Sequence, residues 1–257
     1  MSTIEVGEMA GVGPTAVKRW ADRGLLPCVR TAGGHRRFRR EEVERFLQRQ
    51  QEPTAAMADL LLRGEGLGVE AKLLTERSRH GSWVAVAESL GPVLVEIGSR
   101  WERGLIGILD EHLASERLAR ALSRLAESLP TPPDAPRALL ACAEQDDHGL
   151  GLALAELVLR EAGWRTLWAG RKTPSSEVAD LVRAGAVDLV ALSASVASTD
   201  AAALARDATL IGLACKEASV PLALGGSAPW PDAPPYGRRF HGFPPFVEWV
   251  KGLGLGP

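Results

Sequence analysis

Residues 137–162 read RALLACAEQDDHGLGLALAELVLREA, an apolar run followed by a polar loop and an amphipathic segment. The run over 138–143 predicts a strand buried on both faces, and the apolar spacing after residue 150 predicts a helix. The loop between them is Asp146-Asp147-His148-Gly149-Leu150-Gly151. This order predicts a βα unit of a parallel sheet, with His148 beyond the carboxyl end of the strand, where such sheets bind ligands.

The same alternation continues toward the C-terminus. Further strands are predicted at 165–169, 187–193 and 220–224, with helices near 150–162, 174–184 and 199–217. The rhythm predicts a Rossmann-like, doubly wound parallel sheet over residues 137–257, with helices on both faces. The segments 229–235 and 236–243 are assigned to a last strand and its approach.

Residues 54–128 have a different pattern. Their apolar residues recur three and four positions apart without strand-like alternation, as at Leu90, Val93, Leu94 and Ile97, which predicts a helical domain. The following LPTPPDAP at 129–136 cannot continue a helix, so these residues are predicted to form a stiff linker.

The charge is distributed unevenly along the chain. Residues 1–50 hold ten Lys and Arg against six Asp and Glu, whereas the other 207 residues hold twenty against twenty-six. The basic N-terminal segment over residues 1–50, called the head below, is predicted to bind a polyanion such as DNA. A small basic module with a solvated charged face would have the same composition.

The head has the residue order of a DNA-binding unit. Short helices are predicted at 4–10 and 14–22 around Gly11-Val12-Gly13, and a third at 41–49. Between the second and the third, RTAGGHRRF at 30–38 carries Gly33-Gly34, which suits a tight hairpin with arginines on its strands. This order resembles the MerR family over residues 4–49. The resemblance implies a winged helix-turn-helix over residues 1–52 that binds promoter DNA as a dimer or higher assembly. The residues expected at DNA are Thr15, Lys18, Arg19, Arg30, His35, Arg36 and Arg37.

The loop at 146–151 has the chemistry of a metal-ligand site. His148 offers an imidazole, and Asp146, two residues earlier, can accept a hydrogen bond from the ring nitrogen that is not bound to metal. Gly151 lets a bulky ligand approach the start of the helix. A lone loop histidine is more often an ordinary surface residue, so the motif requires support from its surroundings.

That support comes from a family resemblance. The loop is similar to the DxHxxG motif of the B12-binding domain of methionine synthase and corrinoid proteins, where the histidine is the lower axial ligand of cobalt. The resemblance covers about 137–250 and implies a cobalamin cofactor, with His148 bound to cobalt. Ser195-Val196 is not an ideal match to the family's SxL element, and Gly225-Gly226 matches the paired glycines that make room for the nucleotide tail. The implied cofactor-binding residues here are Asp146, Asp147, Gly149, Gly151, Ser193, Ser195, Gly225 and Gly226.

The helical region contains Trp101, then nine residues, then Glu111-His112. Taken alone, these would be a core tryptophan and a solvated pair. With the head and the loop, W-x9-EH resembles the CarH/LitR/CarA-type B12-dependent photoreceptor repressors. The resemblance implies a four-helix-bundle cap over residues 54–128, in which Trp101, Glu111 and His112 enclose the upper group of adenosylcobalamin. In that group the loaded protein assembles into an oligomer that blocks a promoter, and light breaks the cobalt–carbon bond and the assembly.

One position departs from that pattern. The photoreceptors carry a histidine directly after the tryptophan, which ligates cobalt after photolysis, whereas this chain has Glu102. Imidazole suits such a site better than carboxylate. Our hypothesis is that the chain either lacks the two-histidine photoproduct or borrows another histidine, such as His112.

The bulk composition limits the remaining choices. No apolar run approaches a membrane span, the first residues lack a signal-peptide layout, and the three cysteines form no framework, so a cytoplasmic location is expected. We expect a multidomain α and α/β regulator and no enzyme. Three alternatives stay open: a light-independent B12-sensing repressor, a corrinoid methyl-carrier component, and a MerR-type sensor of another ligand.

Overall fold

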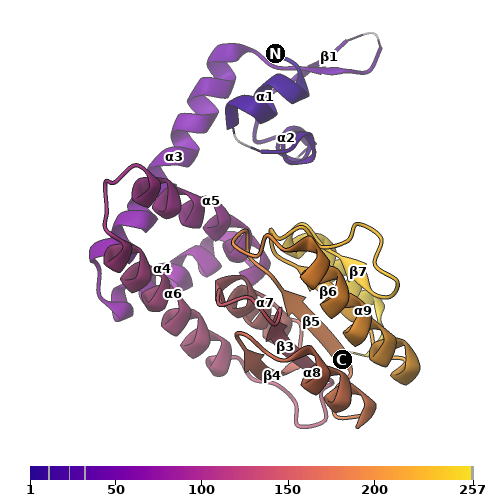
Figure 1. Ribbon diagram of the computed structural model, residues 1–257. Coiled ribbons are helices and arrows are strands. Elements are labelled where there is room, and N and C mark those ends of the chain that lie inside the picture. The colour runs from indigo at the N-terminus through magenta and orange to yellow at the C-terminus, as the bar shows by residue number, and fades with distance from the viewer. Residues whose placement is uncertain (11, 23, 32, 256–257) are drawn as a thin grey trace. The chain divides into compact units, whose positions relative to one another are not determined.

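The computed structural model describes residues 1–10, 12–22, 24–31 and 33–255, and only the backbone of residues 48–52. Gly11, expected in the turn of the head, lies outside these residues, as do the last two positions of the C-terminal domain. The chain divides into two compact units, Met1–Asp59 and Leu60–Pro257 (Figure 1). Among the described residues, no helix combines the length and apolar character needed to cross a membrane.

The first unit is a small helical fold with a hairpin. Helices α1 (Thr3–Ala10) and α2 (Pro14–Asp22) precede the antiparallel strands β1 (Val29–Arg30) and β2 (Arg36–Arg37). Gly34 has a φ of 78°, the positive value that the expected tight turn needs. The elements close over one apolar core, made of Val6, Val17, Leu26, Phe38, Val43 and Phe46.

The third helix is longer than expected. Helix α3 runs from Arg40 to Arg63, although a helix was predicted only to residue 49. Pro53 lies inside it, and proline removes one helical hydrogen bond. The helix nevertheless continues because Met57, Ala58 and Leu61, at helical spacing, are all buried. The predicted division between residues 52 and 54 therefore falls within α3, and the domain boundaries stay a prediction.

The predicted helical region is helical in the structure. It forms α4 (Gly66–His80), α5 (Trp83–Glu102) and α6 (Ile108–Ser128). Ser82 caps α5 by accepting a hydrogen bond from the amide of Ala85 at 3.1 Å. The apolar spacing seen in the sequence faces inward, since Leu90, Val93, Ile97, Leu118, Leu122 and Leu125 are buried.

The C-terminal part is a five-stranded parallel sheet with the order β4-β3-β5-β6-β7. The elements, in chain order, are β3 (Arg137–Cys142), α7 (Leu150–Glu161), β4 (Arg165–Gly170), α8 (Ser175–Arg183), β5 (Leu189–Ser193), α9 (Ala201–Ala218), β6 (Leu222–Gly225), β7 (Arg238–Arg239) and α10 (Phe243–Gly252). Helices α8 and α9 lie side by side over one core face of the sheet (Figure 1). The Rossmann-like prediction is confirmed.

The register explains why the predicted site residues can meet. Cys142 pairs with Ser193, and Ser193 pairs with Gly225, so β3, β5 and β6 end side by side. The connections leave β3 toward β4 on one side and reach β5 on the other, which makes the β3/β5 boundary the topological switch point. Ligands of open parallel sheets bind in the crevice at this point.

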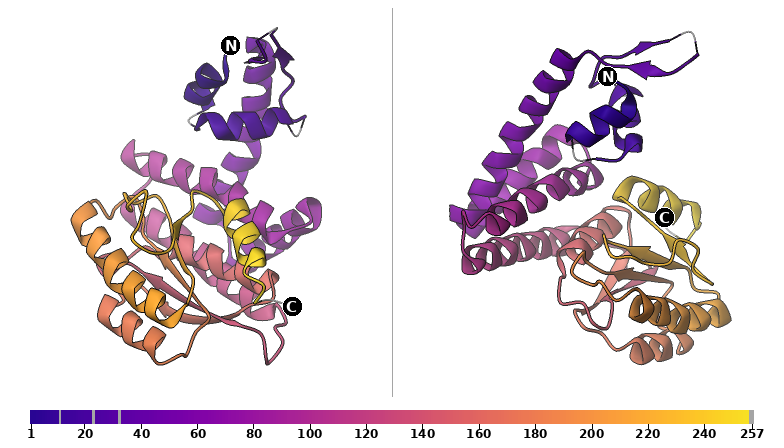
Figure 2. Two further views of the ribbon diagram at one scale, coloured as in Figure 1. Left: turned by 90° about the vertical axis from the view of Figure 1, so that its right-hand side faces the viewer. Right: turned by 45° about the horizontal axis from the view of Figure 1, so that its top comes forward.

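The C-terminal segment contains a helix that the sequence pattern does not predict. Strand β7 has only two residues, and α10 follows directly, although no helix was predicted there. Pro244 and Pro245 suit a first helical turn, where a missing N–H costs nothing. Helix α10 packs against α5 and α7, and it is the yellow helix in Figure 2. Phe246, Val247 and Val250 are buried in it, so packing holds this helix in place.

Candidate functional site

The loop between β3 and α7 presents an exposed imidazole on a buried carboxylate. The side chain of His148 is 61% exposed, while that of Asp146 is fully buried. Nδ1 of His148 lies 3.1 Å from Oδ1 of Asp146. When the Nδ1 proton is donated to this carboxylate, Nε2 keeps its lone pair, which is the tautomer that binds metal. The hydrogen bond expected from the sequence is therefore present.

Asp146 is held by donors from two loops. Its carboxylate accepts hydrogen bonds from the amides of His148, at 2.7 Å, and Ser195, and from the Ser198 hydroxyl at 2.8 Å. Burial by itself would raise the pKa of Asp146, but the hydrogen bonds from Ser195, His148 and Ser198 outweigh it and leave the pKa below its usual value. The carboxylate is therefore ionised near neutral pH and can fix the orientation of the imidazole.

The loop after β4 braces the His148 loop. Lys172 donates its amide to the carbonyl of Asp146 at 2.9 Å, and its Nζ pairs with Asp147 at 2.9 Å. A Cβ on Gly149 would lie 3.1 Å from Nε of Arg171, so this glycine lets the arginine pack closely. Arg171 in turn pairs with Glu116 of α6 at 3.1 Å. This ion pair joins the loops of the sheet to the helical region.

Small residues line the ends of the three central strands. A Cβ on Gly151 would approach Oγ of Ser193 to 3.2 Å, so the start of α7 and the end of β5 are close. Gly226 has a φ of 89°, and its Cβ would lie 2.0 Å from the carbonyl oxygen of Ala194, which no other residue could accommodate. Gly225 is less restricted, because its Cβ would meet Leu192 at 3.9 Å, an ordinary contact.

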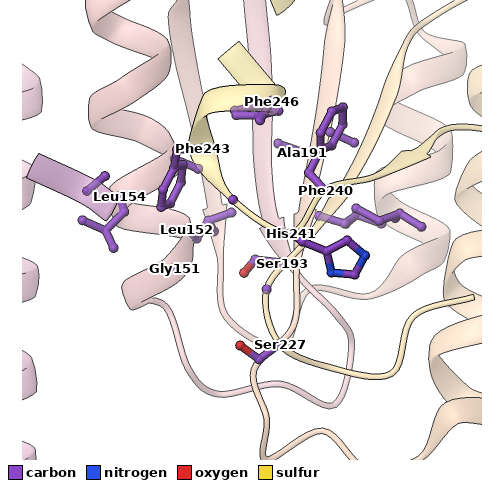
Figure 3. A pocket seen from close by; sticks show the side chains of 18 of the residues that line it. Gly151, Leu152, Leu154, Ala191, Ser193, Ser227, Phe240, His241, Phe243 and Phe246 are labelled. Carbon is purple, nitrogen blue, oxygen red and sulfur yellow. The ribbon is translucent and has the colours of Figure 1, made fainter. Parts of the chain in front are cut away.

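A cavity of about 530 Å³ opens beside these strand ends. Its wall comes from α5, α7, β5, β6 and the segment from β7 into α10, and Figure 3 shows several of its side chains. Sequence reasoning found Gly151, Ser193, Gly225 and Gly226 of this wall and missed the rest. The missed side chains include Glu88, Ser227, Arg239, Phe240, His241, Phe243 and Phe246. The aromatic spacing of 240, 243 and 246 was the available signal.

Trp101, Glu111 and His112 lie on either side of the turn between α5 and α6. Trp101 ends α5 and is 46% exposed, and Glu111 lies in the first turn of α6, where Oε1 accepts from the Ser115 hydroxyl at 2.8 Å. Nε2 of His112 lies 3.7 Å from Oε2 of Glu111. Large apolar side chains are also exposed around this turn, namely Leu105, Ile108, Leu109 and Leu113. The surface is therefore apolar and open.

The residues predicted to meet DNA differ in how free they are. Most of them are exposed on α2 or the hairpin, namely Thr15, Lys18, Arg30, His35 and Arg37. Arg19 is half-buried. Arg36 is also half-buried and forms an ion pair with Asp22 at the end of α2. Arg36 thus ties the hairpin to α2, a role that sequence reasoning did not foresee.

Two family models and two curated relatives match parts of the chain. Residues 1–51 match the family model of a helix-turn-helix domain, and residues 53–126, the helical region, match that of a B12 binding domain. The HTH-type transcriptional repressor CarH of Myxococcus xanthus is 26% identical over 262 residues, 86% of this chain and 87% of that protein. The repressor CarA of the same organism is 27% identical over 218 residues, 73% of this chain and 74% of its own.

A solved structure shares the fold. The monomethylamine corrinoid protein of Methanosarcina barkeri matches with a TM-score of 0.59 at 17% identity, over 79% of this chain and 99% of that one. At this identity the likeness concerns the fold alone.

Proposed function

Because its domain order and most of its length match a CarH-type B12-dependent regulator, we propose that this chain is a cobalamin-dependent transcriptional repressor. The observation that carries the proposal is the exposed imidazole of His148, hydrogen-bonded to a buried, ionised Asp146 at the switch point of the sheet. This is the arrangement that a histidine ligand of a metal requires.

The residues present fit a cobalamin. Nε2 of His148 would be the nitrogen donor that holds cobalt. Gly151 and Gly226 line the cavity at the strand ends, and this cavity has room for the nucleotide tail. When bound, the cofactor would supply a cobalt centre with an exchangeable ligand. Asp146 keeps the ligand tautomer of His148, and Asp147, Gly149, Ser193 and Ser195 shape the loops around it.

For the upper face we propose adenosylcobalamin. The exposed surface at the α5–α6 turn, with Trp101, Glu111 and His112, offers an aromatic ring and polar groups for an adenosyl group. Loss of that group in light would leave this apolar surface uncovered, which favours a change in assembly. The repressor is therefore proposed to respond to light, with Glu102 altering the product formed after illumination.

For the head we propose promoter DNA as the partner. Helix α2 would place Thr15, Lys18 and Arg19 toward the major groove, and Arg30, His35 and Arg37 of the hairpin would meet phosphates. Arg36 would act by holding the hairpin on α2. Self-association to a dimer or tetramer would align two or more heads on one operator.

The proposal is tested on the full chain in darkness. Protein incubated with adenosylcobalamin should keep a red cobalamin spectrum through gel filtration, elute as a larger assembly, and retard DNA taken from upstream of its own gene. Green light should reverse the assembly. His148→Ala should lose the cofactor and the assembly, whereas His80→Ala, a histidine of α4 outside the site, should behave as the parent. A colourless protein in excess cobalamin would contradict the proposal.

A further inference from the structure

We propose that the cavity at the ends of β5 and β6 selects the base of the corrinoid tail, accepting an apolar benzimidazole and rejecting a purine. This inference rests on the proposed function, in which cobalamin binds through His148 and its nucleotide tail enters the cavity. It adds which members of the corrinoid class the site takes. The argument depends on how polar and apolar atoms are distributed along the cavity.

The polar side chains gather at one end. Ser193 is the last residue of β5, and Ala191 lies two residues deeper on the same face of the sheet. Ala223 lies likewise two residues before the end of β6, and both alanines line the cavity. Figure 3 shows Ser193, Ser227 and His241 around one end and Phe246 at the other, with Phe240 and Ala191 nearby. The end near the loops is polar, and the interior is apolar.

Most polar atoms of the two charged side chains of the wall are engaged by the protein, and Nε of Arg239 is the one buried nitrogen of this pair without a partner among the described residues. Glu88 of α5 accepts a hydrogen bond from the amide of Phe243 at 2.9 Å. Arg239 donates from one terminal nitrogen to the carbonyl of Trp230, at 2.7 Å, and to Asp232, and from the other to the carbonyl of Ala228 at 3.1 Å. Glu88 thus holds the start of α10, and Arg239 holds the segment between β6 and β7. The remaining interior surface is largely aromatic and aliphatic carbon.

The two kinds of base differ at the edge that would enter this interior. Adenine has an exocyclic amino group and ring nitrogens there, which would leave water for carbon surroundings without matching partners. Dimethylbenzimidazole has two methyl groups at the same edge, and these gain contact with the side chains of Phe240 and Phe246. Burial of a polar group without a partner weakens binding by roughly tenfold to a hundredfold.

The test compares three corrinoids on the full-length protein in darkness: cobalamin, the analogue with an adenine base, and cobinamide, which lacks the nucleotide. Titration calorimetry gives the affinities, and the absorbance of cobalt reports coordination by His148. Cobalamin should bind best, with the adenine analogue at least about tenfold weaker. Equal affinities for the two bases would overturn the selection while leaving the proposed function intact. Failure of all three to bind would overturn the proposed function itself.

Two variants connect the selection to the cavity. Ala191→Leu fills the interior and should lower the affinity for cobalamin toward that for cobinamide, with cobinamide itself unchanged. Ala202→Leu, at an exposed position of α9, is the matched control. Ala223→Ser adds a hydroxyl with little change in volume, so it remains informative if the leucine disturbs folding. Ala223→Ser should reduce the difference in affinity between cobalamin and the adenine analogue. If this difference is unchanged in both folded variants, the inference is overturned.

Discussion

His148 and His112 are both exposed imidazoles next to a carboxylate, yet their surroundings differ. The partner of His148 is fully buried and accepts hydrogen bonds from amides and hydroxyls of two loops. The partner of His112 is its neighbour Glu111, at 3.7 Å on the open surface of α6. A carboxylate held in this way orients one ring before any ligand arrives, whereas the other ring keeps its freedom. The lower side of the proposed site is prearranged, and the upper side is adaptable.

The largest expected effect comes from removing the buried carboxylate. Asp146→Ala leaves the donors from His148, Ser195 and Ser198 without an acceptor, so we expect the free energy of unfolding to fall by about 1–3 kcal/mol. Cofactor affinity should fall by about ten- to a hundredfold. Denaturant unfolding and cobalamin titration measure the two effects. Asp180→Ala removes only an exposed pair with Arg183 on α8, outside the site, and should change both quantities little. Equal losses in the two variants would contradict a special role for the buried carboxylate.

The second prediction concerns light. In darkness, His112→Ala should still bind adenosylcobalamin through His148, with an affinity lower by roughly threefold to tenfold because one polar contact to the adenosyl group is lost. If His112 binds cobalt after green light, the parent should show a two-histidine absorbance spectrum and His112→Ala should not. If His112 does not bind cobalt, neither protein should show that spectrum. Absorbance spectra before and after illumination measure this. A two-histidine spectrum that survives the substitution would contradict the adaptable upper side.

The third prediction uses pH. The folded pKa of Asp146 lies below its usual value, so the ionised form stabilises the fold above about pH 4, and this contribution is lost as the pH falls through the folded pKa. Burial raises the pKa of Asp207, so its contribution has the opposite sign and is lost as the pH rises through that pKa. Between pH 7 and pH 3, the free energy of unfolding of Asp146→Asn should therefore fall less steeply than that of the parent. That of Asp207→Asn should fall more steeply. If the free energy of unfolding of both variants had the same pH dependence as that of the parent, the two pKa directions would be contradicted.

The smallest expected effect extends the comparison to the head. Arg36 is paired with Asp22, whereas Arg37 is exposed. Arg37→Ala should weaken DNA binding at every sequence and lower its salt slope by about one, as loss of one phosphate contact does. Arg36→Ala should lower the thermal stability of the head and leave the salt slope nearly unchanged. Mobility shifts at several salt concentrations distinguish the two variants. A lower salt slope in Arg36→Ala but not in Arg37→Ala would show that Arg36, and not Arg37, contacts a phosphate.

Most of the sheet could be predicted from local patterns. Strands buried on both faces are short, continuous apolar runs, and the predicted runs agree with β3 to β6 within a few residues. Helices α3 and α10 were incompletely predicted or missed, because each contains proline and is held by packing. Helix propensity alone gives little indication of such elements.

Some contacts of the site can likewise be predicted from local sequence, and others cannot. His148 and Asp146 are two residues apart, so the loop sequence alone shows that they can meet. Ser195 and Ser198 reach Asp146 across 49 and 52 residues, and Glu88 reaches Phe243 across 155. Such contacts depend on strand order and register, which a single sequence does not display.

The sequence by itself determined the order of the domains, the parallel sheet and the imidazole with its carboxylate, because periodicity and short spacing are local properties. Only the tertiary structure decided which donors hold that carboxylate, which side chains line the cavity and which arginine is free for DNA. Those outcomes depend on surfaces distant in the chain meeting at one place, where burial sets the strength of each interaction.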